Sequence, residues 1–215
     1  MFCRRATAIL VITLVRPALA QELTLRVGLI GTERPTSFKP QLRVQITNES
    51  FTSFPLVDQV KTSELLFDGR PFKRTDVPFN GPVGLAPKGS WEGCLNLDEY
   101  VPQAIPPGSH ELEWHLGGAF SPKIHARFPK TVTAAATPQD QLRQVEALKG
   151  VLAPGLLRSC VENWLTERDG GLASSDAVRY YVEPGVKVLV PYDGAAPEPR
   201  LKGAVRIYLE SRVAD

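Results

Sequence analysis

Residues 111–128 read ELEWHLGGAFSPKIHARF, and this stretch decides the fold class of the first part of the chain. Leu112, Trp114 and Leu116 alternate with charged or polar residues before the glycine pair, and Ile124 and Phe128 belong to a second alternating run after it. A period of two with one apolar face is typical of a β-strand that packs on one side. The stretch therefore predicts two antiparallel strands joined by a hairpin.

A hairpin centred on Phe120 makes both faces of this strand pair chemically consistent. On one face it pairs apolar residues, namely Leu112 with Phe128, Trp114 with Ala126, and Leu116 with Ile124. On the other face it pairs Glu113 with Arg127, and His115 with His125. A slip of one residue would move every apolar side chain to the polar face, so we predict this register.

Earlier segments show the same alternation. Leu23–Leu29 and Leu42–Thr47 each have one apolar face, and Trp91–Leu97 marks a further strand. Asp68-Gly69 stands between two short apolar runs, which is typical of a hairpin turn. Several short strands separated by turn signals predict a mainly β fold, with an antiparallel β-sandwich over residues 21–130.

Residues 137–215 change to a helical pattern followed by strands. Thr137, Pro138 and Asp140 are typical of a helix start. Pro154 can open a second helix, whose apolar stripe comprises Leu156, Leu157, Cys160, Val161, Trp164 and Leu165. Strands are expected at Ala177–Val182, Val186–Val190 and Leu201–Leu209, with a turn at Pro184-Gly185. We predict a small α+β domain of two helices and a three-stranded antiparallel sheet.

Two turn motifs carry a family resemblance. Leu85–Ser90, LAPKGS, is followed by Leu95, Leu97 and Tyr100, and then by Pro107–Leu112, PGSHEL. This order resembles the later half of immunoglobulin-like domains of secreted bacterial proteins, of the fibronectin type III and BsuPI kind. The resemblance implies an immunoglobulin-like sandwich and concerns turns, so it implies a fold rather than an activity. Residues 137–215 resemble no family that we recognise.

Residues 1–20, MFCRRATAILVITLVRPALA, have the parts of a secretory signal peptide. A basic start and an uncharged, mostly apolar run precede the small-x-small sequence Ala18-Leu19-Ala20. We expect cleavage before Gln21; an uncleaved anchor is the alternative, because Arg16 lies close to the cut. No later segment holds about 18 consecutive apolar residues, so we predict a secreted or periplasmic protein with no membrane span in the mature chain.

The charge balance argues against a nucleic-acid partner. The whole chain has 25 basic and 23 acidic residues, a net charge of +2. Arg4, Arg5 and Arg16 lie in the predicted signal peptide, which leaves 22 basic and 23 acidic residues and a net charge of −1. A near-neutral chain without a basic stripe lacks the electrostatic footprint of nucleic-acid binding.

Cys94 and Cys160 are the cysteines outside the predicted signal peptide, and export permits a disulfide between them. The alternatives are two free structural thiols, or Cys160 acting as a nucleophile. Cys160 belongs to an apolar helical stripe, where cysteine behaves as a small hydrophobic residue. A thiolate zinc site is not expected, because the chain contains no CxxC motif.

Three histidines, His110, His115 and His125, lie within sixteen residues of one another. In the predicted register His115 and His125 are neighbours across two strands, so they could share a divalent metal, with Glu111 or Glu113 adding an oxygen ligand. His110 should point to the opposite face. The alternative is a solvated polar sheet face, and we expect no other cofactor.

Four tyrosines form a further candidate, namely Tyr180, Tyr181, Tyr192 and Tyr208. An exposed tyrosine could stack on a sugar ring or on a partner peptide. The alternative is that these side chains pack within a small sheet.

No Gly-x-Ser-x-Gly, HExxH, phosphate-loop or EF-hand pattern occurs in the chain. The first hypothesis is therefore an exported, non-catalytic binding or accessory module acting on a protein or on an envelope polysaccharide outside the cytoplasm. The second is a hydrolase with its site in the C-terminal part or at the interface, in a cleft that gathers Glu111, Glu113, His115, Cys160 or Asp176. The third is an inhibitor of exported proteases that presents the loop Val77–Pro82.

Overall fold

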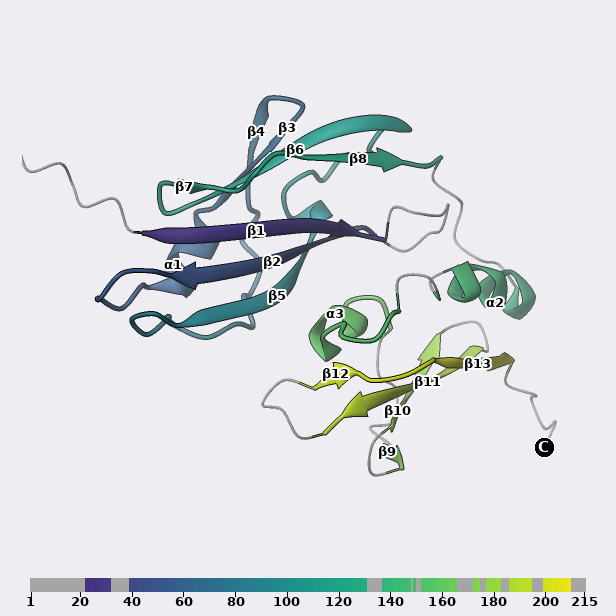
Figure 1. Cartoon of the computed structure of the whole chain (residues 1–215). Helices are drawn as coiled ribbons and strands as arrows, with labels where there is room; N and C mark the ends of the chain where they lie inside the picture. Colours follow the sequence, from purple (N-terminus) through teal and green to yellow (C-terminus); the bar gives the residue numbers. More distant parts are fainter. Residues whose placement is uncertain are drawn as a thin grey trace, which may run out of the picture.

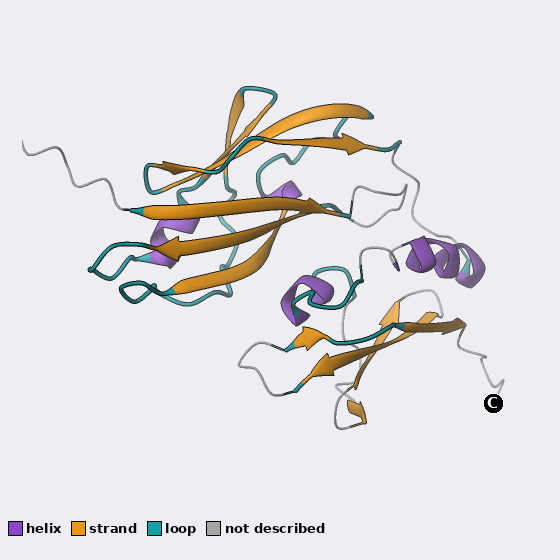
Figure 2. Cartoon of the chain, viewed as in Figure 1, coloured by secondary structure: helices purple, strands orange, loops and turns teal. Residues whose placement is uncertain are grey.

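The computed structural model describes residues 22–31, 39–130, 137–147, 149, 152–165, 172–174, 177–182, 186–194 and 199–209. The predicted signal peptide and the predicted Pro184-Gly185 turn lie outside these residues. The described chain is mainly β, and its strands form antiparallel sheets (Figure 2). None of the helices within these ranges is long and apolar enough to cross a membrane.

The first sheet has the order β1-β2-β5 and comprises β1 (Leu23–Ile30), β2 (Gln41–Asn48) and β5 (Ser90–Asn96). All three strands are antiparallel to their neighbours, with Leu25 opposite Ile46 and Ile46 opposite Trp91. The predicted strands are thus confirmed, except that the third ends at Asn96, because Leu97–Glu99 forms a short 3₁₀ turn, η1.

The second sheet contains β3 (Glu64–Phe67), β4 (Arg70–Lys73), β6 (Gly108–Leu116), β7 (Ala119–Phe120) and β8 (Ile124–Phe128). The predicted hairpin at Asp68-Gly69 is confirmed: Phe67 pairs with Arg70, and the two turn residues have φ angles of 50° and 75°. Positive φ at both central positions is the requirement of the turn that matches strand twist.

The predicted register of the second hairpin is wrong, by four residues along β8 and by five along β7. Leu112 lies opposite Ile124, and His115 lies opposite Phe120 rather than His125. The reason is the glycine pair: Gly117 and Gly118 adopt φ angles of 56° and 84° and close a two-residue turn at once, so that Leu116 pairs with Ala119. The shift along β8 is even, so the predicted apolar and polar faces of that strand are still correct.

The two sheets pack against each other around one hydrophobic core (Figure 1). Fully buried side chains from both layers meet there, together with residues of the short helix α1 (Leu56–Lys61); the largest are Trp114, Tyr100, Phe54, Leu42, Ile46, Leu56 and Leu65. The Tyr100 hydroxyl accepts a hydrogen bond from Trp114 Nε1 at 2.9 Å and is bonded to Ser63 Oγ at 2.8 Å. The buried indole N–H and the two buried hydroxyl groups therefore all have hydrogen-bond partners.

The C-terminal part consists of two helices and a further sheet. Helix α2 (Pro138–Ala147) begins as predicted: Asp140 N–H donates to Thr137 Oγ1 at 3.1 Å. The predicted second helix is shorter than expected, because α3 covers Arg158–Glu162. It starts late because the backbone around Leu156 pairs with the Arg200 strand instead: Leu201 N–H donates to Leu156 O at 2.8 Å.

The third sheet has the order β12-β11-β10-β9, with β13 also paired to β11. Its strands are β9 (Leu172–Ser174), β10 (Ala177–Val182), β11 (Val186–Asp193), β12 (Arg200–Leu201) and β13 (Arg206–Leu209). The single strand predicted at Leu201–Leu209 is thus divided in two. Pro191 of β11 has no N–H to donate, so the ladder is interrupted opposite this residue and resumes at Leu189.

Helix α3 lies between the third sheet and the outer face of the first sheet (Figure 1). The predicted apolar stripe is confirmed, since each of its six side chains is at least nine-tenths buried: Leu156, Leu157, Cys160, Val161, Trp164 and Leu165. They form a second hydrophobic core with the inner face of β10 and β11. The described chain therefore has two cores, which meet across α3.

Candidate functional site

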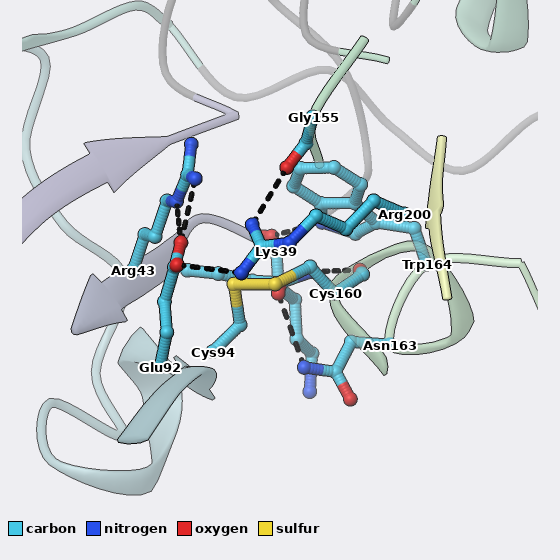
Figure 3. The surroundings of a disulfide bond; sticks show 10 residues. Lys39, Arg43, Glu92, Cys94, Gly155, Cys160, Asn163, Trp164 and Arg200 are labelled. Carbon is cyan, nitrogen blue, oxygen red and sulfur yellow. Dashed lines mark hydrogen bonds and ion pairs between the residues drawn. A yellow bond between two sulfur atoms is a disulfide. The ribbon is translucent and has the colours of Figure 1, made fainter. Parts of the chain in front are cut away.

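The two cores are joined by a disulfide between Cys94 and Cys160, which confirms the predicted pairing. Cys94 lies on the face of β5 that points away from the first core, and Cys160 lies on α3 (Figure 3). The two Cα atoms are 5.2 Å apart, within the usual range for a disulfide. Cys160 is fully buried and its sulfur is bonded, so the alternative of a nucleophilic thiol is wrong.

Hydrogen bonds beside the disulfide fix the orientation of α3. The buried Gln41 side chain donates from Nε2 to Cys160 O at 3.1 Å and accepts from Asn163 Nδ2 at 3.0 Å. Trp164 Nε1 donates to Lys39 O at 2.7 Å. The Gln41 amide thus both donates to and accepts from the α3 segment, and the Trp164 indole adds a third hydrogen bond. Together these bonds fix the position of α3 on the sheet.

An ion-pair network lies on the other side of the disulfide. Glu92 accepts from Arg43 Nε at 2.6 Å and from Arg200 Nη2 at 2.9 Å, and Arg200 also donates to Gly155 O at 3.1 Å (Figure 3). Partial burial works to raise the pKa of Glu92, but the two arginines outweigh it and hold the pKa below its usual value. Glu92 is therefore a carboxylate that joins β2, β5 and β12, and it is unsuited to donate a proton.

A groove of about 420 Å³ opens at this junction, along the free edge of β5. One wall is the loop Pro78–Gly81, the floor is the edge of β5 from Trp91 to Leu95, and the opposite wall belongs to α3 and the residue after it, with Ser159, Glu162 and Asn163. The volume lies within the range of small-ligand sites. Both parts of the molecule contribute to its lining.

The loop wall is held by a buried arginine. The Arg74 side chain is 1% exposed, and its guanidinium contacts Glu99 Oε2 at 2.8 Å. The same group donates to the backbone oxygens of Val77 at 3.2 Å and Pro78 at 3.3 Å. The loop that the inhibitor hypothesis relied on is therefore anchored at its base and forms a wall of the groove.

Two aromatic side chains line the groove at the level of the first core. The rings of Phe79 and Trp91 meet edge to face with centroids 5.2 Å apart. A Cβ atom on Gly93 would lie 2.1 Å from the Trp91 ring, and one on Gly81 would lie 2.2 Å from the Phe79 ring. A side chain at either position would displace the ring that packs directly on the backbone there.

The structure does not bring together the two histidines, His115 and His125, of the predicted metal site. His115 and the residue opposite His125, which is Glu111, are four positions apart on β6, a separation of about 13 Å along a strand. His115 Nε2 contacts Glu113 Oε1 at 3.0 Å, and the His115 ring packs on Phe120. In the described ranges, no three histidine, cysteine, aspartate or glutamate side chains are grouped to hold a metal ion.

The described residues of the tyrosine and hydrolase hypotheses form neither an exposed aromatic platform nor a shared cleft. Tyr180 and Tyr192 are buried with their hydroxyls 2.8 Å apart, so neither presents a platform; the side chains of Tyr181 and Tyr208 lie outside the described residues. Of the residues that the hydrolase hypothesis would gather, Glu111, Glu113 and His115 lie on β6 in the other sheet, and Asp176 lies outside the described residues. None of the described members of this set lines the groove.

Sequence reasoning missed most of the residues that build the groove. It considered the loop Val77–Pro82, which contains Phe79, only for protease inhibition, and periodicity gives Arg74, Glu99 and Gly93 no role. The usable signal was Gly93 between Trp91 and Leu95, because glycine inside a strand often marks the close approach of another group.

Comparisons with known proteins add no relative: the chain matches no family model, no curated protein and no solved structure.

Proposed function

We propose that this protein is an exported, non-catalytic binding or accessory module, and that the groove along β5 is its ligand site. The observation that carries this proposal is the construction of the groove. Its two walls come from segments about 80 residues apart in the sequence, and a disulfide and a set of hydrogen bonds hold them together. A preformed site of this kind binds without the entropic cost of ordering its own walls.

Export is supported by the disulfide and by the sequence of residues 1–20. A disulfide persists in oxidising compartments such as the periplasm or the extracellular space. The signal-peptide pattern supports the same location, with cleavage before Gln21. An intact mass that begins at Gln21 and is two hydrogens lighter than the reduced chain is the expected result for the exported protein.

An immunoglobulin-like sandwich is part of the proposal. The order β1-β2-β5 in one sheet, facing β4-β3-β6-β8 in the other, supports it, as do the turns before β5 and β6 that carry the sequence resemblance. Such folds often use loops and sheet edges for binding, and the groove lies at a sheet edge.

A binding role is supported by the contacts of the carboxylates in the groove. Glu99 contacts Arg74 at 2.8 Å, and Glu162 accepts from Arg158 at 2.6 Å. Both carboxylates are thus engaged by arginines of the fold itself. These ion pairs fix the polar side chains of the groove in place, as a preformed binding site requires.

The test is a titration of the ¹⁵N-labelled, disulfide-bonded protein with two probes, solubilised peptidoglycan fragments and a pool of unstructured peptides. We expect chemical-shift changes at Phe79, Asn80, Trp91 and Asn163 with one of them. Asn80→Ala should weaken that binding by about tenfold, the loss of one hydrogen bond. Gln103→Ala, an exposed amide outside the groove, is the matched control and should leave it unchanged. Shifts confined to other surfaces would overturn the proposal.

A further inference from the structure

We infer that the groove binds an extended, uncharged peptide segment of a partner protein, which adds to the first sheet as a strand beside β5. This inference rests on the proposed function and names the ligand class of the same site. It is carried by the backbone of β5, by the loop that faces it, and by the two different walls of the groove.

The backbone of β5 has one paired edge and one open edge. β5 is the last strand of the order β1-β2-β5, and its residues Ser90–Asn96 pair with β2 alone. No backbone bond of the described chain reaches the far side of β5 between Trp91 and Leu95. In this antiparallel pairing the backbone groups that point away from β2 belong to Glu92 and Cys94. Cys94 lines the groove, so its outward N–H and C=O groups are available to a ligand.

The chain's own neighbouring segment is unable to fill this position. The loop that runs past the edge contains Pro78 and Pro82, which have no N–H to donate, and Gly81, which is covered by the Phe79 ring. Arg74 holds the carbonyl oxygens of Val77 and Pro78 on its guanidinium. The fold thus keeps the edge open while placing a wall beside it.

An added strand would meet a different wall on each face. Its side chains alternate between the two faces of the sheet. On the core side they would meet Phe79 and Trp91, and on the outer side the polar groups of Ser159, Glu162 and Asn163. The segment that fits therefore alternates apolar residues with small polar residues.

The charge of the groove selects for a neutral segment. Its carboxylates, Glu99 and Glu162, are each paired with an arginine, and the guanidinium of Arg74 is buried. A charged ligand side chain would have to compete with these pairs. Main-chain hydrogen bonds would supply the affinity, and the two walls would supply the specificity, as in other cases of strand addition.

The test uses the full disulfide-bonded chain and a phage-displayed library of random linear dodecapeptides. The tightest peptide is synthesised with single N-methyl groups at successive positions, because N-methylation removes one backbone donor. We expect alternate N-methyl groups to weaken binding by at least tenfold and the intervening ones to change it less than twofold. Cross-strand nuclear Overhauser effects should connect the peptide to residues 91–95.

A pair of phenylalanine variants locates the binding. Phe79→Ala should weaken the selected peptide by at least tenfold, whereas Phe51→Ala should leave its affinity unchanged, because Phe51 is 85% exposed on a loop that does not line the groove. Peptide binding with no alternation in the N-methyl series, or unaffected by Phe79→Ala, would overturn strand addition.

The two proposals fail in different ways. If peptidoglycan fragments shift the groove resonances and no selected peptide does, strand addition is wrong and the groove remains a binding site for a polysaccharide. If neither probe shifts residues 79–80, 91–95 and 163, the proposed function fails together with strand addition.

Discussion

The two cores of this protein each bury a pair of hydroxyl groups, but they are built in different ways. In the first core Tyr100 is bonded to Trp114 and Ser63, and all three residues belong to the two-sheet part of the molecule. In the second core Tyr180 is bonded to Tyr192, and the helix that covers this sheet is itself seated on β5 of the first part. The first core is closed by its own two sheets, whereas the second is completed by its contact with the first.

The largest expected effect comes from breaking the first core. Trp114→Ala should lower the free energy of unfolding by about 3–5 kcal/mol, because it removes a fully buried indole and leaves the Tyr100 hydroxyl without its donor. Urea unfolding followed by circular dichroism measures the change. Phe120→Ala is the control, since Phe120 is 63% exposed and its loss should cost less than about 0.5 kcal/mol. Equal effects would contradict the assignment of the core.

The next effect sharpens the difference between the two parts. Replacing both cysteines, Cys94→Ala with Cys160→Ala, should cost about 2–4 kcal/mol by the loss of a bond that closes a separation of 66 residues. We expect the loss to fall on the C-terminal part, so that amides of α3 and β10 gain hydrogen exchange while those of β6 keep their protection. A uniform loss of protection across β6 and β10 would show that the two parts unfold as one unit.

The faces of the strands were predictable, but one register was not. Alternation assigns Leu112, Trp114 and Leu116 to the core correctly, because burial depends only on parity. The register depends on where the turn closes. Gly117 and Gly118 accept positive φ and permit the tightest turn, whereas the prediction treated the whole stretch from Gly117 to Pro122 as a loop. The position of the glycine pair therefore determines where the turn closes, which hydrophobic periodicity does not indicate.

The disulfide was predictable and the groove was not. Cys94 and Cys160 were the one available pair, and parity placed Cys94 on the outer face of its strand. The groove depends on long-range contacts that leave no local pattern: Arg74 reaches Glu99, and Gln41 reaches Asn163 across 122 positions. The role of a side chain in such a long-range contact can be predicted from a sequence only when its partner is already known.

A smaller effect compares the two buried hydroxyl pairs. Tyr100→Phe should cost about 1–3 kcal/mol, because Trp114 Nε1 and Ser63 Oγ both lose the same partner in a buried site. Tyr192→Phe should cost about 0.5–1.5 kcal/mol, because the Tyr180 hydroxyl still has Glu162 Oε1 at 3.4 Å. Thermal unfolding of the two variants side by side gives the order, and a larger loss in Tyr192→Phe would reverse the comparison.

The same tyrosines should titrate abnormally. Burial raises the pKa of Tyr100 to about 12, and burial together with the Tyr180 hydroxyl raises the pKa of Tyr192 as well. An ultraviolet titration of the folded protein should therefore leave both phenols neutral at pH 10.5. In Tyr100→Phe, the absorbance change at high pH should be smaller by the contribution of one tyrosine. That result would assign this part of the titration to the first core.

The smallest effect concerns His110, at the end of the first core. Its Nδ1 lies 2.7 Å from Asp68 Oδ2 and its Nε2 lies 2.9 Å from Pro106 O, and both partners are acceptors. A ring that donates from both nitrogens carries both protons, so His110 is an imidazolium in this arrangement. Burial among Phe67 and Phe128 works against the charge, but the two hydrogen bonds outweigh it and raise the pKa of His110 above 6.5.

The ion pair between His110 and Asp68 makes the free energy of unfolding depend on pH in a defined direction. Because its folded pKa is raised, His110 contributes stability that is present below pH 6.5 and is lost as the pH rises through the folded value. The hydrogen bond from His110 lowers the pKa of Asp68 below 3.8, so the Asp68 contribution is present above that pH and is lost on further acidification. The difference in free energy of unfolding between the wild type and His110→Phe should therefore be largest near pH 5 and fall by at most about 1 kcal/mol by pH 8.5.

Phenylalanine keeps the ring contacts with Phe67 and Phe128. The contributions of the other histidines to the pH dependence cancel in the difference, because both proteins contain them. A ring-proton titration that gives His110 a pKa at or below 6.5, or a difference that grows with pH, would contradict the doubly protonated ring and with it the role of this contact in closing the end of the first core.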